Sequence, residues 1–205
     1  MSLQNRVRPT GEIVADNWRG EWMGNRGILH DENKCLGSAR WKHQNWVICR
    51  LSFKGRDREV MRAGSYYTEL FFHDEACALA AGHRPCAECR REDYLRFREG
   101  WECAHGPLVN AAAMDRALHR TRVVGRSKEQ VRYMVDSANL PDGTVFLDDD
   151  SQPSLAWGGL ARVWTPTGYL APQPLPRRAV MVCTPAPTVA VLREGYRPKP
   201  HESLM

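Results

Sequence analysis

The spacing of two cysteines is the feature of the sequence that most directly suggests chemistry. Cys86 and Cys89 are separated by two residues and follow Pro85. Two thiolates three positions apart in a turn can both face one ion, and tetrahedral zinc prefers such sulfur ligands. A redox pair would instead open a helix after a buried strand, whereas a short helical segment and Gly-His-Arg-Pro precede the motif here. The motif favours metal binding over redox chemistry, and two inert structural cysteines remain the alternative.

An acidic residue and a histidine form a second candidate pair. Asp115 and His119 are four positions apart in a segment with helical spacing, so both would lie on one helix face. The carboxylate could then hold one ring nitrogen of the histidine and leave the other to act as a general base. The alternative is an ordinary contact on an exposed helix face.

Arginines gather around the two cysteines and on the residues that follow them. Residues 84–132 carry 11 basic and 7 acidic side chains, whereas residues 1–83 carry 12 and 10. Arg84, Arg90 and Arg91 flank the thiols closely enough to offset a charged metal site or to contact phosphates. A local excess of positive charge attracts polyanions, so nucleic acid is the predicted partner. A solvated, salt-bridged helix face is the alternative.

Three short apolar runs predict strands upstream of the motif, over residues 26–30, 45–53 and 64–72. Each is rich in β-branched or aromatic residues, and Gly or Asn turn signals flank them. Residues 1–20 carry no comparable pattern, and a loosely structured segment is expected there.

Helical patterns surround the cysteine pair. Acidic residues open the segment 74–81 and Gly82 ends it, which predicts a short helix. Aromatic spacing predicts a second helix over 90–101. Asn110 is a suitable N-cap for a third helix over 111–122.

From residue 140 onward the pattern changes to strands and turns. Residues 144–147, 160–164 and 179–183 read as strands, and 188–192 as one helical turn. Eight of the 13 prolines follow position 165, which suits turns and edge segments rather than helices.

These elements predict an α+β fold in two parts. Residues 1–135 would form a small mixed sheet with short helices around a cysteine-rich metal site, and residues 136–205 a β-rich region packed against it.

Two segments of the chain resemble the zinc-binding DNA-repair domain of Ada-type proteins. That domain carries a pattern close to EALAAGFRPCxxC, and this chain has EACALAAGHRPCAEC ending at Cys89. Upstream, VICRLSFKGR over residues 47–56 is similar to that family's IFCRPSCRAR. The resemblance covers residues 45–92. It implies zinc as cofactor, Cys49 as both ligand and methyl acceptor, and methyl transfer from damaged DNA as the activity.

The chain departs from the family at one ligand. Phe53 stands where the family has the second upstream cysteine. With Cys49, Cys86 and Cys89 matched, zinc needs a fourth ligand from elsewhere or a bound water. Cys35 is the first candidate, and the others are His30, His43, Cys103 and His105.

Three classes of function remain open from the sequence. The first is a zinc-binding module of unassigned activity that contacts nucleic acid. The second is an enzyme that uses Cys49 as methyl acceptor, or Asp115 and His119 for hydrolysis. The third is a structural or interaction protein with neither metal nor nucleic acid.

The composition indicates in which cellular compartment the protein is expected. Net charge is +5, and no window approaches 18 consecutive apolar residues, so no membrane span is expected. The N-terminal residues lack the apolar core of a secretory signal. Seven cysteines at irregular spacing fit a reduced compartment better than a disulfide framework. The cytoplasm is therefore the expected location.

Overall fold

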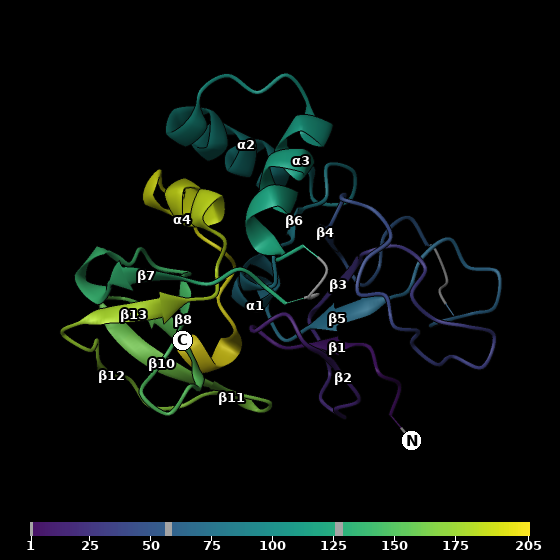
Figure 1. The fold of residues 1–205 in the computed structure, drawn as a ribbon, viewed down its shortest axis with the longest axis horizontal. Helices are drawn as coiled ribbons and strands as arrows, with labels where there is room; N and C mark the ends of the chain where they lie inside the picture. Colours follow the sequence, from purple (N-terminus) through teal and green to yellow (C-terminus); the bar gives the residue numbers. More distant parts are fainter. Residues whose placement is uncertain (1, 56–58, 126–128) are drawn as a thin grey trace.

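The computed structural model describes residues 2–55, 59–125 and 129–205, which form two sheets and four helices (Figure 1). The α+β class is thereby confirmed. The first sheet has six strands in the order β2-β1-β5-β3-β4-β6. Pairing is parallel between β1 and β5 and between β4 and β6, and antiparallel elsewhere, so the sheet is mixed. Its strands are β1 Arg6–Val7, β2 Ile13–Val14, β3 Trp22–Asn25, β4 Val47–Cys49, β5 Leu70–Phe72 and β6 Arg84–Pro85.

The helices begin and end close to where their capping residues predict. They are α1 Glu75–Ala80, α2 Arg91–His105, α3 Ala111–Arg122 and α4 Ala186–Arg193. The Asp74 carboxylate accepts the Cys77 N–H at the start of α1, and the Asn110 side chain accepts the Ala113 N–H at the start of α3. These bonds satisfy backbone donors that a helix leaves free in its first turn.

The second sheet is antiparallel throughout and follows the order β11-β10-β9-β8-β13-β7, with β12 on β10. Its strands are β7 Tyr133–Asp136, β8 Val145–Leu147, β9 Pro153–Trp157, β10 Leu160–Thr165, β11 Gly168–Tyr169, β12 Gln173–Pro174 and β13 Ala179–Val182. Two short 3-10 helices, η1 Ser137–Asn139 and η2 Glu202–Leu204, complete the chain.

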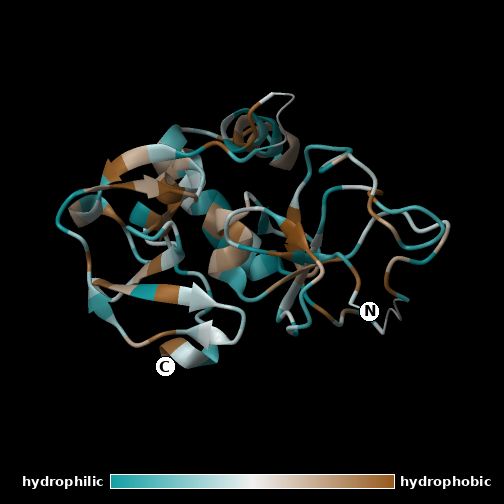
Figure 2. Cartoon of the chain, turned by 60° about the horizontal axis from the view of Figure 1, so that its bottom comes forward, coloured by the Kyte–Doolittle hydropathy of each residue, from teal (hydrophilic) through white to brown (hydrophobic). Residues whose placement is uncertain are grey.

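Helix α1 lies between the two sheets and is fully buried. Ala78 and Leu79 pack into the core of the first half, whereas Ala76, Cys77 and Ala80 pack into a core of the second half. Helix α4 returns from the second sheet to pack beside α2, and its Val191 and Leu192 join the first core. In Figure 2 the hydrophobic segments gather in strands and helices, while the long loops on the N-terminal side are mostly hydrophilic.

Several expected elements differ from the structure. The strand expected over 26–30 is wrong: β3 ends at Asn25, and Gly27, at a φ of 98°, turns the chain away. Residues 1–20 contain β1 and β2 rather than a loose segment. Strands β7 and β9 were not expected. The two-residue strands β1 and β2 carry no readable periodicity. Strand β9, buried at four consecutive positions, lacks the alternation that marks a half-buried strand.

Candidate metal centre

Three cysteine sulfurs from two segments of the first half come together. Those of Cys49, Cys86 and Cys89 all lie within 4.8 Å of one another. Cys49 ends β4, and Cys86 follows β6, the strand that pairs in parallel with β4. The Cys86 N–H donates to the Ile48 carbonyl at 2.9 Å and continues this pairing. Sheet pairing therefore brings Cys49 to the Cys86–Cys89 turn.

Backbone N–H groups near the sulfurs favour their charged form. Those of Cys89 and Glu88 act to lower the pKa of Cys86, and that of Arg50 acts to lower the pKa of Cys89. The turn then leads directly into α2, where the Arg90 N–H donates to the Cys86 carbonyl at 3.1 Å. Hydrogen bonds of this kind favour the charged form of an acceptor, so the turn is arranged for thiolates.

The three thiols influence one another's ionisation strongly. Hydrogen bonds from Cys49 and Cys89 lower the pKa of Cys86 far below that of an ordinary thiol. Hydrogen bonding to Cys86 and Cys89, followed by burial, raises the pKa of Cys49. Like charges this close oppose each other's ionisation. All three can be thiolates together when a bound cation compensates their charge.

An apolar shell surrounds the sulfurs. Met23, buried, shares their cluster, and Tyr67, Phe71 and Val47 pack against it. Phe53, at the position of the fourth family cysteine, packs there as well. Cys49 and Cys89 are buried and Cys86 is half-buried, so the centre reaches solvent on the Cys86 side. A low-dielectric shell strengthens the attraction between thiolates and a cation.

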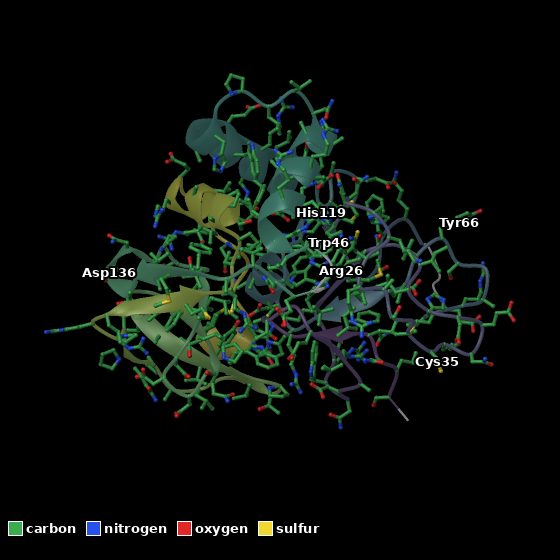
Figure 3. The ribbon with its side chains drawn as sticks, in the orientation of Figure 1. Arg26, Cys35, Trp46, Tyr66, His119 and Asp136 are labelled. Carbon is green, nitrogen blue, oxygen red and sulfur yellow. The ribbon has the colours of Figure 1, made fainter. Side chains whose placement is uncertain are left out.

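Cys35 is not part of this group. It is exposed in the tight loop that Asp31 closes, and its sulfur contacts the Asn33 carbonyl at 3.7 Å. Figure 3 shows it at the surface. The loop bonds Cys35 to its own neighbours rather than directing it inward. It was a reasonable candidate by residue type alone.

The remaining candidates for a fourth ligand also have other surroundings. His30 lies 2.6 Å from the Thr68 hydroxyl, and His43 lies 2.9 Å from the Asn25 side chain. His105 contacts the Pro187 carbonyl at 3.1 Å, and Cys103 is exposed on α2. Among the described residues, the group that contains Cys49, Cys86 and Cys89 has no fourth member.

Asp115 and His119 share helix α3 but do not bond to each other. Arg84 donates to both carboxylate oxygens of Asp115, at 2.9 and 2.7 Å. His119 instead places Nδ1 3.4 Å from Arg122 and packs edge-on against Trp41 and Trp46. Burial, followed by the charge of Arg122, lowers the pKa of His119. The carboxylate that would orient a general base is engaged by an arginine.

Two of the three arginines expected to contact phosphates are buried. Arg84 is 4% exposed and Arg90 is 1% exposed. Arg90 pairs with Glu75 and Asp93 at 2.8 and 2.7 Å, and its guanidinium lies over the Trp22 ring. Buried ion pairs therefore engage the charges of Arg84 and Arg90 within the fold. Arg91 is exposed on the first turn of α2 and remains available.

A second group that sequence reasoning missed is formed by His73, Asp74 and Cys77. Asp74 caps α1 with one oxygen and accepts the Tyr169 hydroxyl at 2.7 Å with the other. The His73 ring stacks on that of His201 at 4.2 Å. Both carboxylate oxygens are thus engaged in tying α1 to the second sheet. Asp74 was identifiable as a cap, but its partner is 95 residues away.

No helix in the described ranges is long and apolar enough to cross a membrane. The chain matches no protein-family model, no curated protein and no solved structure.

Proposed function

We propose that this protein binds one zinc ion through the thiolates of Cys49, Cys86 and Cys89. The observation that supports this most directly is the convergence of three sulfurs within 4.8 Å, one from the end of β4 and two from the Cys86–Cys89 turn. Sulfurs bound to one tetrahedral zinc at about 2.3 Å are roughly 3.8 Å apart, so little movement is needed. Sulfur donors are those that zinc prefers over magnesium or calcium.

Among the described residues, this donor set leaves one coordination position open for a further ligand. Three protein ligands with an open fourth position are the arrangement of catalytic zinc, whereas closed four-ligand sites are structural. Cys86, the half-buried member, lies on the side open to solvent. Zinc bound here would supply charge compensation for the thiolates and a Lewis-acid position within reach of solvent.

Metal analysis of the purified chain tests this proposal. We expect about one zinc per chain in protein never exposed to chelator, and loss of most of it in Cys49→Ser, Cys86→Ser and Cys89→Ser. Cys103→Ser, on the exposed face of α2, is the matched control and should keep its zinc. Metal-free wild-type protein that also fails to bind added zinc would refute the proposal.

The resemblance to Ada-type domains extends the proposal to methyl transfer. In that reaction the Cys49 sulfur forms a bond to a methyl carbon, the bond from that carbon to a phosphate oxygen breaks, and the oxygen keeps the electron pair as an anion. Support comes from the place of Cys49 at the end of β4 within the cluster. Phe53 replaces a fourth thiolate, which makes the site less electron-rich, so slow transfer is expected.

Methylation with methyl iodide followed by peptide mapping tests the acceptor. Label should appear first on Cys49 in zinc-loaded protein and should be lost in Cys49→Ser. Label on Cys103 or Cys183 with Cys49 unmodified would rule out this acceptor while leaving the zinc proposal intact.

Nucleic acid is the partner that this chemistry requires. Arg50 and Arg91 are exposed and stand one and two positions from Cys49 and Cys89. Affinity for a labelled oligonucleotide should fall steeply between about 50 and 200 mM salt, because each phosphate contact releases counterions. Arg91→Glu should weaken binding, whereas Arg177→Glu, exposed before β13, should not. Binding that ignores salt, or none at low salt, would count against this partner.

A further inference from the structure

A large cavity separate from the cysteines is strongly basic. It has a volume of about 810 Å³ and lies between the β1–β2 hairpin, the loop before β4 and the end of α3. Five arginines line it against two glutamates, and two tryptophans contribute to its wall. The arginines are Arg8, Arg26, Arg40, Arg122 and Arg132. One glutamate, Glu12, is already engaged by Arg8.

Arg26 lines this cavity as a buried cation that has no acidic partner among the described residues. It is 3% exposed. Its guanidinium makes only long contacts, to the carbonyls of Gly11 and Ala81 at 3.4 and 3.3 Å and to the His83 ring at 3.5 Å. A guanidinium has five N–H donors, so some of its capacity is unused.

Arg122, the last residue of α3, is similar. It is 1% exposed and donates to the carbonyls of Gly82 and Gln44 at 2.7 and 2.6 Å. Its Nε is buried and has no hydrogen-bond partner among the described residues. Figure 3 shows Arg26, Trp46 and His119 gathered at this place beside α3.

The two guanidiniums lie over the same indole. Their Cζ atoms are 4.1 and 4.0 Å from the centre of the Trp46 ring, so they are no more than about 8 Å apart. The described residues provide neither one with an ion pair. Asp115, the acid that acts on Arg122, has both oxygens bound to Arg84. Burial lowers the pKa of Arg26 and of Arg122 to about 9, which leaves both charged at neutral pH.

Two buried like charges beside a cavity are costly to the fold unless an anion compensates them. Arginine matches the oxygens of phosphate in geometry as well as charge. We propose that this cavity binds the phosphate group of a small phosphorylated molecule through Arg26 and Arg122. Arg40 and Arg132 add charge, and the half-buried Trp41 offers an aromatic face to a ring carried by the ligand.

Calorimetric titration of the full-length, zinc-loaded protein tests this proposal with three probes: inorganic phosphate, ribose 5-phosphate and AMP. All three should bind, and AMP should bind most tightly if the tryptophan wall holds a ring. Sodium chloride at equal ionic strength should not raise the thermal midpoint, whereas phosphate should, because a ligand of the native state stabilises it.

Two variants locate the site. Arg122→Gln removes a charge-assisted contact and should weaken AMP binding by about tenfold or more. Arg132→Gln, on the exposed part of the wall, retains the buried residues and should weaken binding several-fold even if Arg122→Gln does not fold. Arg120→Gln, exposed on α3 outside the cavity, should bind as the wild type does. Absence of binding by all three probes, or equal affinity in Arg132→Gln and wild type, would overturn the proposal.

Discussion

Arg84 and Asp115 form a bidentate ion pair, with N–O distances of 2.9 and 2.7 Å, in which both side chains are almost fully buried. The pair joins β6, the strand that leads into Cys86, to helix α3. The sequence suggested phosphate contact for Arg84 and acid–base chemistry for Asp115. In the structure, the two side chains instead bind each other and stabilise the frame of the cysteine centre. Residue type and spacing alone did not distinguish a functional role for these residues from a structural ion pair.

Removal of one member of this pair should be strongly destabilising. Asp115→Asn leaves the buried Arg84 charge uncompensated, and we expect a loss of about 3–5 kcal/mol in the free energy of unfolding. The double variant Arg84→Met with Asp115→Leu removes both charges and should recover much of that loss. Urea denaturation measures both. Equal stability of Asp115→Asn and wild type would contradict a structural role for the pair.

Neighbouring arginines provide a matched comparison. Arg90→Ala would leave the carboxylates of Glu75 and Asp93 without their buried partner, at a cost of about 3–5 kcal/mol. Arg91→Ala, at an exposed position, should change stability by less than about 0.5 kcal/mol. Guanidinium denaturation of the two variants checks the difference. Similar losses in both would show that α2 depends on something other than the Arg90 network.

Histidine burial should make stability depend on pH. Burial, then the charges of Arg26 and Arg122, hold the pKa of His83 well below its usual value. The unfolded chain takes up a proton near pH 6.5 that the folded chain refuses. Stability should be fully present above about pH 7 and should fall as the pH drops from there toward 5, by up to about 1.4 kcal/mol per pH unit from this residue.

The His83→Gln variant tests that origin directly. Its free energy of unfolding should vary less between pH 7 and pH 5 than that of the wild type, whatever its absolute stability. His105→Gln, at an exposed position on α2, should retain the wild-type slope. An unchanged slope in His83→Gln would assign the pH dependence to other groups.

Zinc removal should lower stability through the loss of a ligand of the native state. Free zinc at about 1,000 times the dissociation constant of the site stabilises the fold by about 4 kcal/mol. Chelation should therefore lower the thermal midpoint of the wild type. Chelator should have little effect on Cys89→Ser, which has lost a ligand. If chelator leaves the thermal midpoint of zinc-loaded wild-type protein unchanged, zinc does not contribute to the stability of the fold.

The sequence alone determined the local features of this protein. The Cys86–Cys89 turn, the capped starts of α1 and α3, and the start of α2 depend on residues within a few positions of each other, so their signals are contained in short windows. The end of α2 lies at His105, four residues beyond the predicted end. The α+β class follows from the same local patterns. For Cys49, only the resemblance to a known family pointed to the cluster.

Tertiary structure decided which side chains meet across long stretches of chain. Parallel pairing of β4 with β6 brings Cys49 to a turn 37 positions further on. Folding also pairs Arg84 with Asp115, and it leaves Arg26 and Arg122 buried on one indole with no ion pair to any acid in the described ranges. The sequence does not show whether a charged residue is solvated, paired or buried. Its free energy depends on its neighbours in space, and those are set only when the sheets and helices pack together.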